Sequence, residues 1–209
     1  EDGTINGYHK EELNLDNINE GKNLFTLYDL TGKEKYAKAT SRIYQQILEM
    51  PRTKEGNFWH KMIYPNQVWL DGLYMAQPFY IEYENRFSDK KNYEDIFHQF
   101  FEVERNMKDR ETGLYYHAYD SERKMFWADK ETGLSRNFWL RSLGWFSMAL
   151  LDTLVLADKD YPDYDHLQQM YRDLIDSMLK FQSPEGMWYQ VPNFPGREKN
   201  YLETSGSSI

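Results

Sequence analysis

Residues 70–107 read LDGLYMAQPFYIEYENRFSDKKNYEDIFHQFFEVERNM, and the fold can be inferred from this stretch. Apolar residues recur at helical spacing on both sides of the polar segment FSDKKNYED. The pattern predicts two helices, about Leu70 to Arg86 and Tyr93 to Met107, that form a helical hairpin.

The same arrangement occurs before and after this stretch. A first helix, about Leu15 to Leu30, stops at DLTGKEKY, where Thr31-Gly32 supplies the C-terminal turn, and a second runs to about Met50. A third pair, about Asn137 to Leu156 and Tyr164 to Phe181, is joined by DKDYPDYDH. The sequence therefore predicts three hairpins.

A related loop follows each hairpin, at residues 55–72, 112–145 and 185–206. Each loop contains a Gly followed by an aromatic-rich alternating run, which is typical of a short strand or hairpin. All three loops should emerge on the same side of the helix array. They either pack against the helix ends or form a binding site at that face.

The predicted fold class is all-α, specifically an (α/α)6 barrel, which is a toroid of six hairpins. Residues 1–209 show three hairpins and end at ETSGSSI, where the earlier loops pass into a new helix. We therefore expect the central portion of one barrel domain, truncated at both ends. The alternative is an open helical solenoid that is whole as it stands. An incomplete ring would expose apolar helix faces and should self-associate.

The composition limits the classes of ligand that the protein can be expected to bind. The aromatic fraction is 17%, with 17 Tyr and 6 Trp, and such rings stack on sugars and on nucleobases. The net charge of -9 argues against nucleic acid, since phosphate binding needs a cationic surface. Mean hydropathy is -0.85, and we expect no membrane association.

Cysteine usage and the first residues bear on the compartment. The absence of Cys fits the cytoplasm or the periplasm, and no signal peptide is visible at the start of the chain. Either compartment remains open, and the oligomeric state is not predicted.

Two aspartates stand where loops enter helices. Asp71 follows Trp69 and Leu70, and Asp16 has a similar position in LNLDNINEG. Either could be a helix N-cap or first-turn acid. Alternatively, the two could face each other across a sugar as a general acid/base pair.

Cationic residues occupy related positions. His60 and Lys61 lie upstream of Asp71, His117 occupies the equivalent run of the next loop, and Arg141 lies between Trp139 and Trp145. Each alone is more often structural, but together they would make a cationic pocket for an anionic sugar. We expect no metal and no cofactor, because the sequence carries no HExxH or carboxylate-rich metal loop.

Three long strings resemble glycoside hydrolase family 105, the unsaturated rhamnogalacturonyl hydrolases, which is related to the family 88 unsaturated glucuronyl hydrolases. They are GNFWHKMIYPNQVWLDGLYMAQPF, TGLYYHAYDSERKMFWADKETGLSRNFWLRSLGWFSMALLD and GMWYQVPNFPGREKNYLETSGS. The resemblance runs from EELNLDNINEG to the last residue. It implies a six-hairpin (α/α) barrel of which this chain is the central, catalytic portion.

The resemblance also implies site residues. The catalytic aspartate of the family lies in the motif that reads WLDG here, which implies Asp71, and the second pocket aspartate implies Asp16. The family's substrate-binding positions correspond to His60, Lys61, Trp69, His117, Trp139, Arg141 and Trp145. One departure is Tyr119, where relatives often have Trp, and this could alter the outer pocket.

The activity that the resemblance implies is hydrolysis of Δ4,5-unsaturated uronyl oligosaccharides, the products of pectin and rhamnogalacturonan lyases, in a bacterium. Asp71 would protonate the C4=C5 double bond, and water would then add. Two alternatives remain, a conventional inverting glycosidase and a non-catalytic helical-repeat carbohydrate-binding module.

Overall fold

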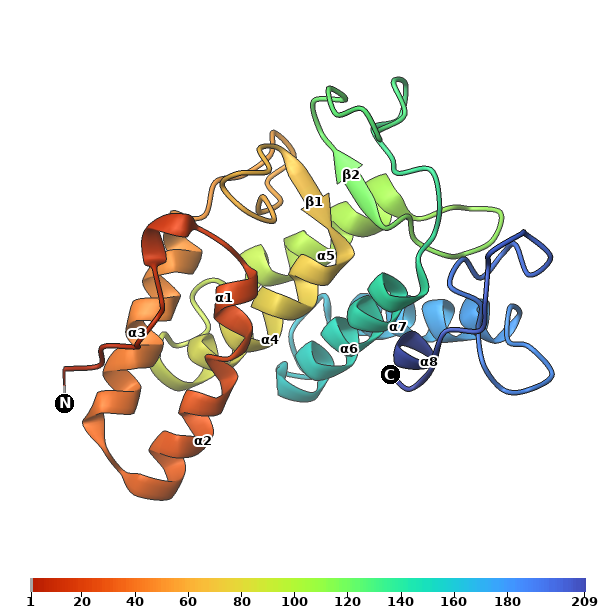
Figure 1. The fold of residues 1–209 in the computed structure, drawn as a ribbon. Helices are drawn as coiled ribbons and strands as arrows, with labels where there is room; N and C mark the ends of the chain where they lie inside the picture. The colour runs from red at the N-terminus through yellow and green to blue at the C-terminus, as the bar shows by residue number, and fades with distance from the viewer. Residues whose placement is uncertain (1) are drawn as a thin grey trace.

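The computed structural model describes residues 2–209 and contains the three predicted helical hairpins (Figure 1). The elements in chain order are a 3-10 turn Lys10–Glu12, α1 Asp16–Asn19, α2 Lys22–Thr31, α3 Glu34–Glu49, β1 Gln67–Trp69, α4 Leu70–Phe87, α5 Tyr93–Met107, β2 Ala118–Asp120, α6 Leu140–Leu156, α7 Tyr164–Leu179 and α8 Thr204–Ser207. Figure 1 shows β1, β2 and the loops around them gathered at one end of the helices.

The helices form two layers. In one layer α4 packs against α6 on one side and α1 on the other, and α8 packs on α6. In the second layer α3, α5 and α7 each pack against the preceding helix of their own hairpin. Consecutive hairpins therefore stack side by side, as expected for an (α/α) array.

Each outer helix buries one stripe of apolar side chains. In α5 the buried residues Ile96, Phe100, Val103 and Met107 recur every three or four positions, while Glu94 at the first turn is exposed. Burying a large apolar side chain contributes about 1.5–3 kcal/mol, so one such stripe is enough to fix the packing face of the helix.

Two helix boundaries in the structure differ from the predicted ones. The predicted helix Leu15–Leu30 is divided into α1 and α2 at Gly21, where an added Cβ would lie 2.8 Å from the Ile43 side chain and 2.9 Å from Phe79. The chain approaches its neighbours too closely there for any side chain. The helix expected from Asn137 begins at Leu140, because Trp139 is still extended, with φ −136° and ψ 122°.

Each inner helix begins in the same way. A buried leucine donates its backbone N–H to a carbonyl of the following loop. The three pairs are Leu15 with His60 at 3.1 Å, Leu70 with His117 at 3.2 Å, and Leu140 with Gln190 at 2.9 Å. An ionisable residue follows each of these leucines, namely Asp16, Asp71 and Arg141. The start of α8 has the same pattern, with Glu203 after Leu202. The repeat thus brings four ionisable side chains to one end of the inner layer.

The strands join neighbouring loops. β1 and β2 pair antiparallel, with Trp69 opposite Ala118 and Gln67 opposite Asp120. The first and second loops are therefore held together immediately before α4 begins.

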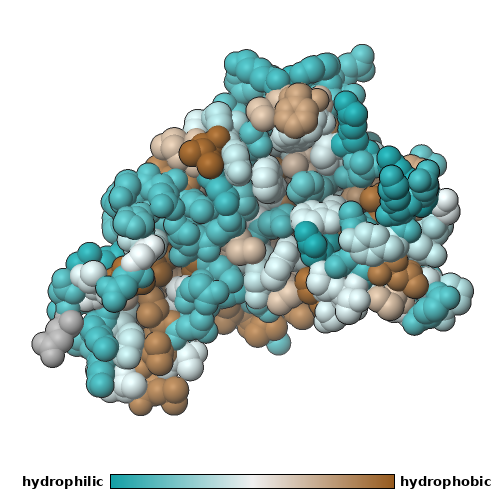
Figure 2. All heavy atoms as spheres, in the orientation of Figure 1, coloured by the Kyte–Doolittle hydropathy of each residue, from teal (hydrophilic) through white to brown (hydrophobic). Residues whose placement is uncertain are grey.

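The surface at the loop end is mostly polar, with a few apolar groups exposed among the polar ones (Figure 2). Figure 2 also shows apolar side chains along the opposite end, over α2 and α3. Within residues 2–209, no helix combines the length and apolar character needed to cross a membrane.

Candidate active site

Asp16 lies in the first turn of α1 and is bound by two basic side chains from the next loop. His60 Nε2 is 3.3 Å from Oδ1, and Lys61 Nζ is 2.6 Å from Oδ2. Burial raises the pKa of Asp16, but the hydrogen bonds from His60 and Lys61 outweigh it and lower the pKa to about 2. The carboxyl group of Asp16 is therefore ionised at neutral pH.

Asp71 occupies the equivalent position on α4, in a different environment. Its Oδ2 atom is buried and has no hydrogen-bond partner among the described residues. Burial raises the pKa of Asp71, and the negative charge of Asp16 raises it further, against the opposing effect of His117 and His60. The neutral form of Asp71 is thus favoured beside an ionised Asp16. Such a division between two carboxyl groups is typical of an acid/base site.

His117 lies between the aspartate and an aromatic wall. Burial lowers its pKa, although the charge of Asp71 acts in the opposite direction. Its Nε2 atom is buried and without a hydrogen-bond partner within residues 2–209. A neutral imidazole with a free ring nitrogen can exchange a hydrogen bond with a ligand.

Stacked and edge-on rings connect the predicted residues. His60 stacks on Trp69 with centroids 4.7 Å apart, and Trp69 meets His117 edge-on at 5.6 Å. His117 in turn meets Trp139 edge-on at 5.1 Å, and the Arg141 guanidinium lies 4.2 Å from the Trp139 centroid. Contacts therefore run without a break from Asp16 through the first and second loops to Arg141.

Gly72 makes this arrangement possible. A Cβ at this position would lie 2.9 Å from His60 Nδ1 and 3.0 Å from Leu15 Cδ1. His60 can lie against the first turn of α4, and so beside Asp71, because residue 72 has no side chain.

Trp145 belongs to a second group of residues, one turn further along α6. It stacks on Tyr74 of α4 at 5.0 Å, and Lys22 of α2 lies 3.8 Å from the Tyr74 centroid. The inner layer therefore continues with aromatic and cationic side chains below the first group.

Several neighbours of the predicted site residues were not predicted. Tyr64 stacks on Trp69 at 5.2 Å, and Tyr74 carries the contact between Trp145 and Lys22. Both tyrosines fall within the quoted strings, but nothing in the sequence separates them from the buried tyrosines of the same segments.

Tyr119, the departure noted in the sequence, is a buried structural residue. Its hydroxyl group donates to Glu55 Oε1 at 2.9 Å, and Ser121 donates to Glu55 Oε2 at 2.6 Å. Burial, together with Glu55, raises the pKa of Tyr119 to about 12. The residue thus braces the second loop against the first.

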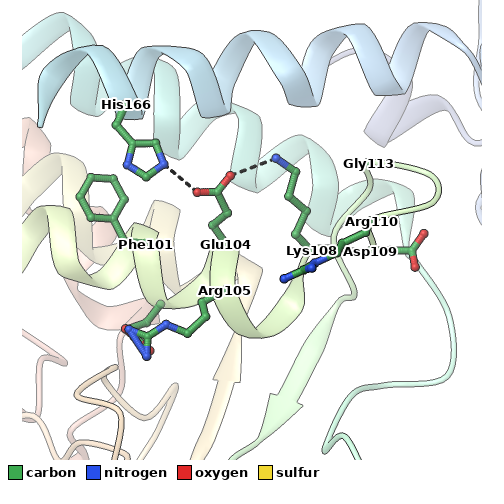
Figure 3. A pocket seen from close by; sticks show the side chains of 9 residues that line it. Phe101, Glu104, Arg105, Lys108, Asp109, Arg110, Gly113 and His166 are labelled. Carbon is green, nitrogen blue, oxygen red and sulfur yellow. Dashed lines mark hydrogen bonds and ion pairs between the residues drawn. The ribbon is translucent and has the colours of Figure 1, made fainter.

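A separate cavity of about 580 Å³ lies on the outer layer, between α5 and α7 (Figure 3). Its central carboxylate, Glu104, is 2.8 Å from His166 Nε2 and 3.0 Å from Lys108 Nζ, and Phe101 stacks on His166. Because these charges already satisfy one another, the cavity is a weaker candidate than the loop end. Among residues 2–209, no three His, Asp or Glu side chains form a metal-binding cluster.

The chain is similar to known proteins in sequence and in fold. The sequence profile of the family described as Glycosyl Hydrolase Family 88 matches residues 1–209. A family 105 glycoside hydrolase structure from C. acetobutylicum ATCC 824 is 50% identical, with a TM-score of 0.97 over 99% of this chain and 58% of that chain. An unsaturated glucuronyl hydrolase structure from Streptcoccus agalactiae, at 16% identity and TM-score 0.68, shows the same fold.

Among curated proteins, the unsaturated rhamnogalacturonyl hydrolase YesR of Bacillus subtilis (strain 168) is 27% identical over 202 residues, which are 94% of this chain and 56% of YesR. The chain therefore spans little more than half the length of these relatives. The predicted all-α toroid fold and the predicted family are both confirmed, and the chain belongs to Glycosyl Hydrolase Family 88.

Proposed function

We propose that this chain carries the catalytic centre of a hydrolase that acts on Δ4,5-unsaturated uronyl oligosaccharides. The proposal rests on the different surroundings of the two aspartates. Asp16 is bound by His60 and Lys61, whereas Asp71 Oδ2 is buried and has no partner among the described residues. These surroundings lower the pKa of Asp16 to about 2 and raise that of Asp71. The similarity to YesR, an unsaturated rhamnogalacturonyl hydrolase, supports the same substrate class.

Asp71 is the proton donor in this proposal. The ring oxygen makes the C4=C5 bond a vinyl ether, so neutral Asp71 protonates C4 and leaves an oxocarbenium-like centre at C5. Water adds at C5 and gives its proton to the Asp71 carboxylate, which restores the acid. The resulting hemiketal opens and releases the remaining sugar. One carboxyl group serves both steps, provided that it is protonated when substrate binds.

Asp16 acts on Asp71 through its charge and orients the substrate. Held by Lys61 and His60, it stays ionised and disfavours a second negative charge nearby. It therefore keeps Asp71 in the protonated form that the first step needs.

The remaining predicted residues bind the anionic ring. Arg141 and His117 are available to hold the uronyl carboxylate, and guanidinium groups match carboxylates in a two-pronged geometry. Trp69, Trp139 and Trp145 provide flat apolar faces that stack on sugar rings and exclude water.

The test uses the complete protein and an unsaturated uronyl disaccharide. Turnover removes the conjugated C4=C5 bond, so the ultraviolet absorbance of the substrate should fall, and Asp71→Asn should abolish the fall. A native protein that leaves the absorbance unchanged would contradict the proposal. Release of sugar from a saturated disaccharide instead would identify a conventional inverting glycosidase. Binding without any product would identify a carbohydrate-binding module.

A further inference from the structure

Two hollows adjoin the candidate site, and they share one wall. The hollow on the Trp69 side has a volume of about 390 Å³, and the one on the Trp139 side about 500 Å³. Both are lined by His117, Phe126 and Trp127. An adjacent pair of aromatic residues therefore lines both hollows together with His117.

Phe126 is far more exposed than the other phenylalanines, with 85% of its surface accessible. Isolated exposed apolar residues are common and by themselves need no explanation. What distinguishes Phe126 is that the segment that carries it, residues 121–130, is fastened at both ends.

The first fastening is the buried carboxylate of Asp120 at the end of β2. It accepts the backbone N–H groups of Glu122, Lys124 and Met125 at 3.0, 2.7 and 2.8 Å. Three hydrogen bonds to one carboxylate fix the turn that leads to Phe126.

The second fastening comes from the far side of the segment. Lys130 Nζ donates to the carbonyl groups of Arg123 and Met125 at 3.3 and 3.2 Å. The backbone N–H of Asp120 also donates to the Gly133 carbonyl at 2.8 Å, which closes the loop on β2. The backbone that carries the aromatic pair is therefore fixed without a ligand, and a ligand that stacks on the pair does not have to order the loop.

We propose that Phe126 and Trp127 form the stacking platform for the leaving sugar, the ring attached to the unsaturated uronide through the scissile bond. This inference rests on the proposed function. The uronide binds beside Asp71, Asp16 and Arg141. Both hollows adjoin this place at His117 and offer room for the next ring against the platform. Flat aromatic faces bind the C–H faces of pyranose rings, whereas a small alkyl leaving group has no such face. The platform therefore determines preference for the leaving group and takes no part in proton transfer.

The experiment compares two substrates in the complete protein. One is an unsaturated uronyl disaccharide, and the other is the methyl glycoside of the same unsaturated uronide. For Phe126→Ala we expect KM for the disaccharide to rise roughly three- to tenfold, with kcat little changed and with both constants for the methyl glycoside as in the native protein. Phe126→Tyr keeps the flat face and should restore KM, whereas Phe126→Leu should not.

The matched control is Leu30→Ala, which removes an apolar side chain of similar exposure, 77%, at the C-terminal end of α2. It should leave both substrates unaffected. Equal losses on both substrates for Phe126→Ala, or native behaviour of Phe126→Leu on the disaccharide, would overturn the platform while leaving the proposed function intact. A native protein that turns over neither substrate would overturn both.

Discussion

Asp71 and Asp16 follow equivalent leucines, and their surroundings shift the pKa values of their carboxyl groups in opposite directions. Lys61 and His60 reach across from the loop to Asp16, whereas Oδ2 of Asp71 is buried and, within the described residues, unpartnered. A buried carboxyl group of this kind is unfavourable for stability and useful for chemistry, because it holds a proton at a pH at which exposed aspartates have lost theirs.

Asp71→Asn should separate activity from stability. We expect kcat to fall about 10²- to 10⁴-fold, because the amide cannot exchange the proton. The pKa of Asp71 is raised on folding, so its stabilising contribution is complete below the unfolded pKa of about 3.9 and is lost as pH rises through the folded pKa. The variant should therefore unfold at a higher temperature than the native protein at pH 7, with a smaller difference at pH 4. A lower Tm at pH 7 would contradict this assignment.

Asp16→Asn should change the pH profile. The charge of Asp16 raises the pKa of Asp71, so its removal should lower that pKa and shift the alkaline limb of kcat/KM to lower pH. Initial rates between pH 4 and 9 measure the shift. Glu11→Gln, a change at an exposed carboxylate that lies outside the site, serves as the control. An unmoved alkaline limb would mean that the two carboxyl groups do not influence each other.

The positions of Asp71 and Asp16 in the first turn of a helix could be predicted from the sequence, since each stands immediately after a leucine where an apolar periodic run begins. The opposite pKa shifts could not. They depend on which side chains of the next loop reach each aspartate. The backbone hydrogen bonds of Leu15 with His60 and of Leu70 with His117 set the distance between each aspartate and that loop.

The first turn of α4 depends on a missing side chain. Gly72→Ala would place a methyl group 2.9 Å from His60 Nδ1 and 3.0 Å from Leu15, so His60 must shift. We expect a loss of about 1–3 kcal/mol in unfolding free energy and a lower kcat/KM. Chemical denaturation and initial rates provide the two measurements.

The matched change is Gly196→Ala, where a Cβ would meet nothing within 4 Å in the described part of the chain. It should be neutral in both measurements. If Gly72→Ala is equally neutral, His60 is not held against α4 as the structure indicates.

The presence of each long helix could be predicted from the spacing of apolar residues, but the residues at which the helices begin and end depend on packing. At Gly21, where α1 and α2 divide, an added Cβ would meet Ile43 and Phe79, which are distant in sequence. The pairing of β1 with β2 likewise joins two loops separated by a complete hairpin. A local pattern gives the type of each element, and only the assembled hairpins determine where it begins and ends.

A buried carboxylate links neighbouring hairpins. Glu84 of α4 accepts a hydrogen bond from the Tyr44 hydroxyl of α3 at 2.6 Å and from the Asn92 backbone at 2.9 Å. Glu84→Ala should lower the unfolding free energy by about 2–4 kcal/mol, because it leaves these buried donors unpaired. The measurement is denaturant unfolding, with Glu94→Ala at an exposed position as the control. Equal effects of the two changes would mean that the buried link adds nothing.

The apolar face of α6 predicts self-association of residues 1–209 expressed alone. Val155 is 74% exposed and Leu151 lies one turn away on the same face. Val155→Lys should reduce the association, whereas Thr26→Lys, at an exposed polar position, should not. Light scattering measures the apparent mass. A monomeric native chain would contradict the expectation.

The repeated start of the inner helices has a consequence for redesign. The same leucine and the same kind of backbone hydrogen bond precede an acid in two repeats and a base in the third, as Asp16, Asp71 and Arg141 illustrate. The charge at the loop end of the inner helices can therefore be redesigned by substituting this residue in one repeat at a time.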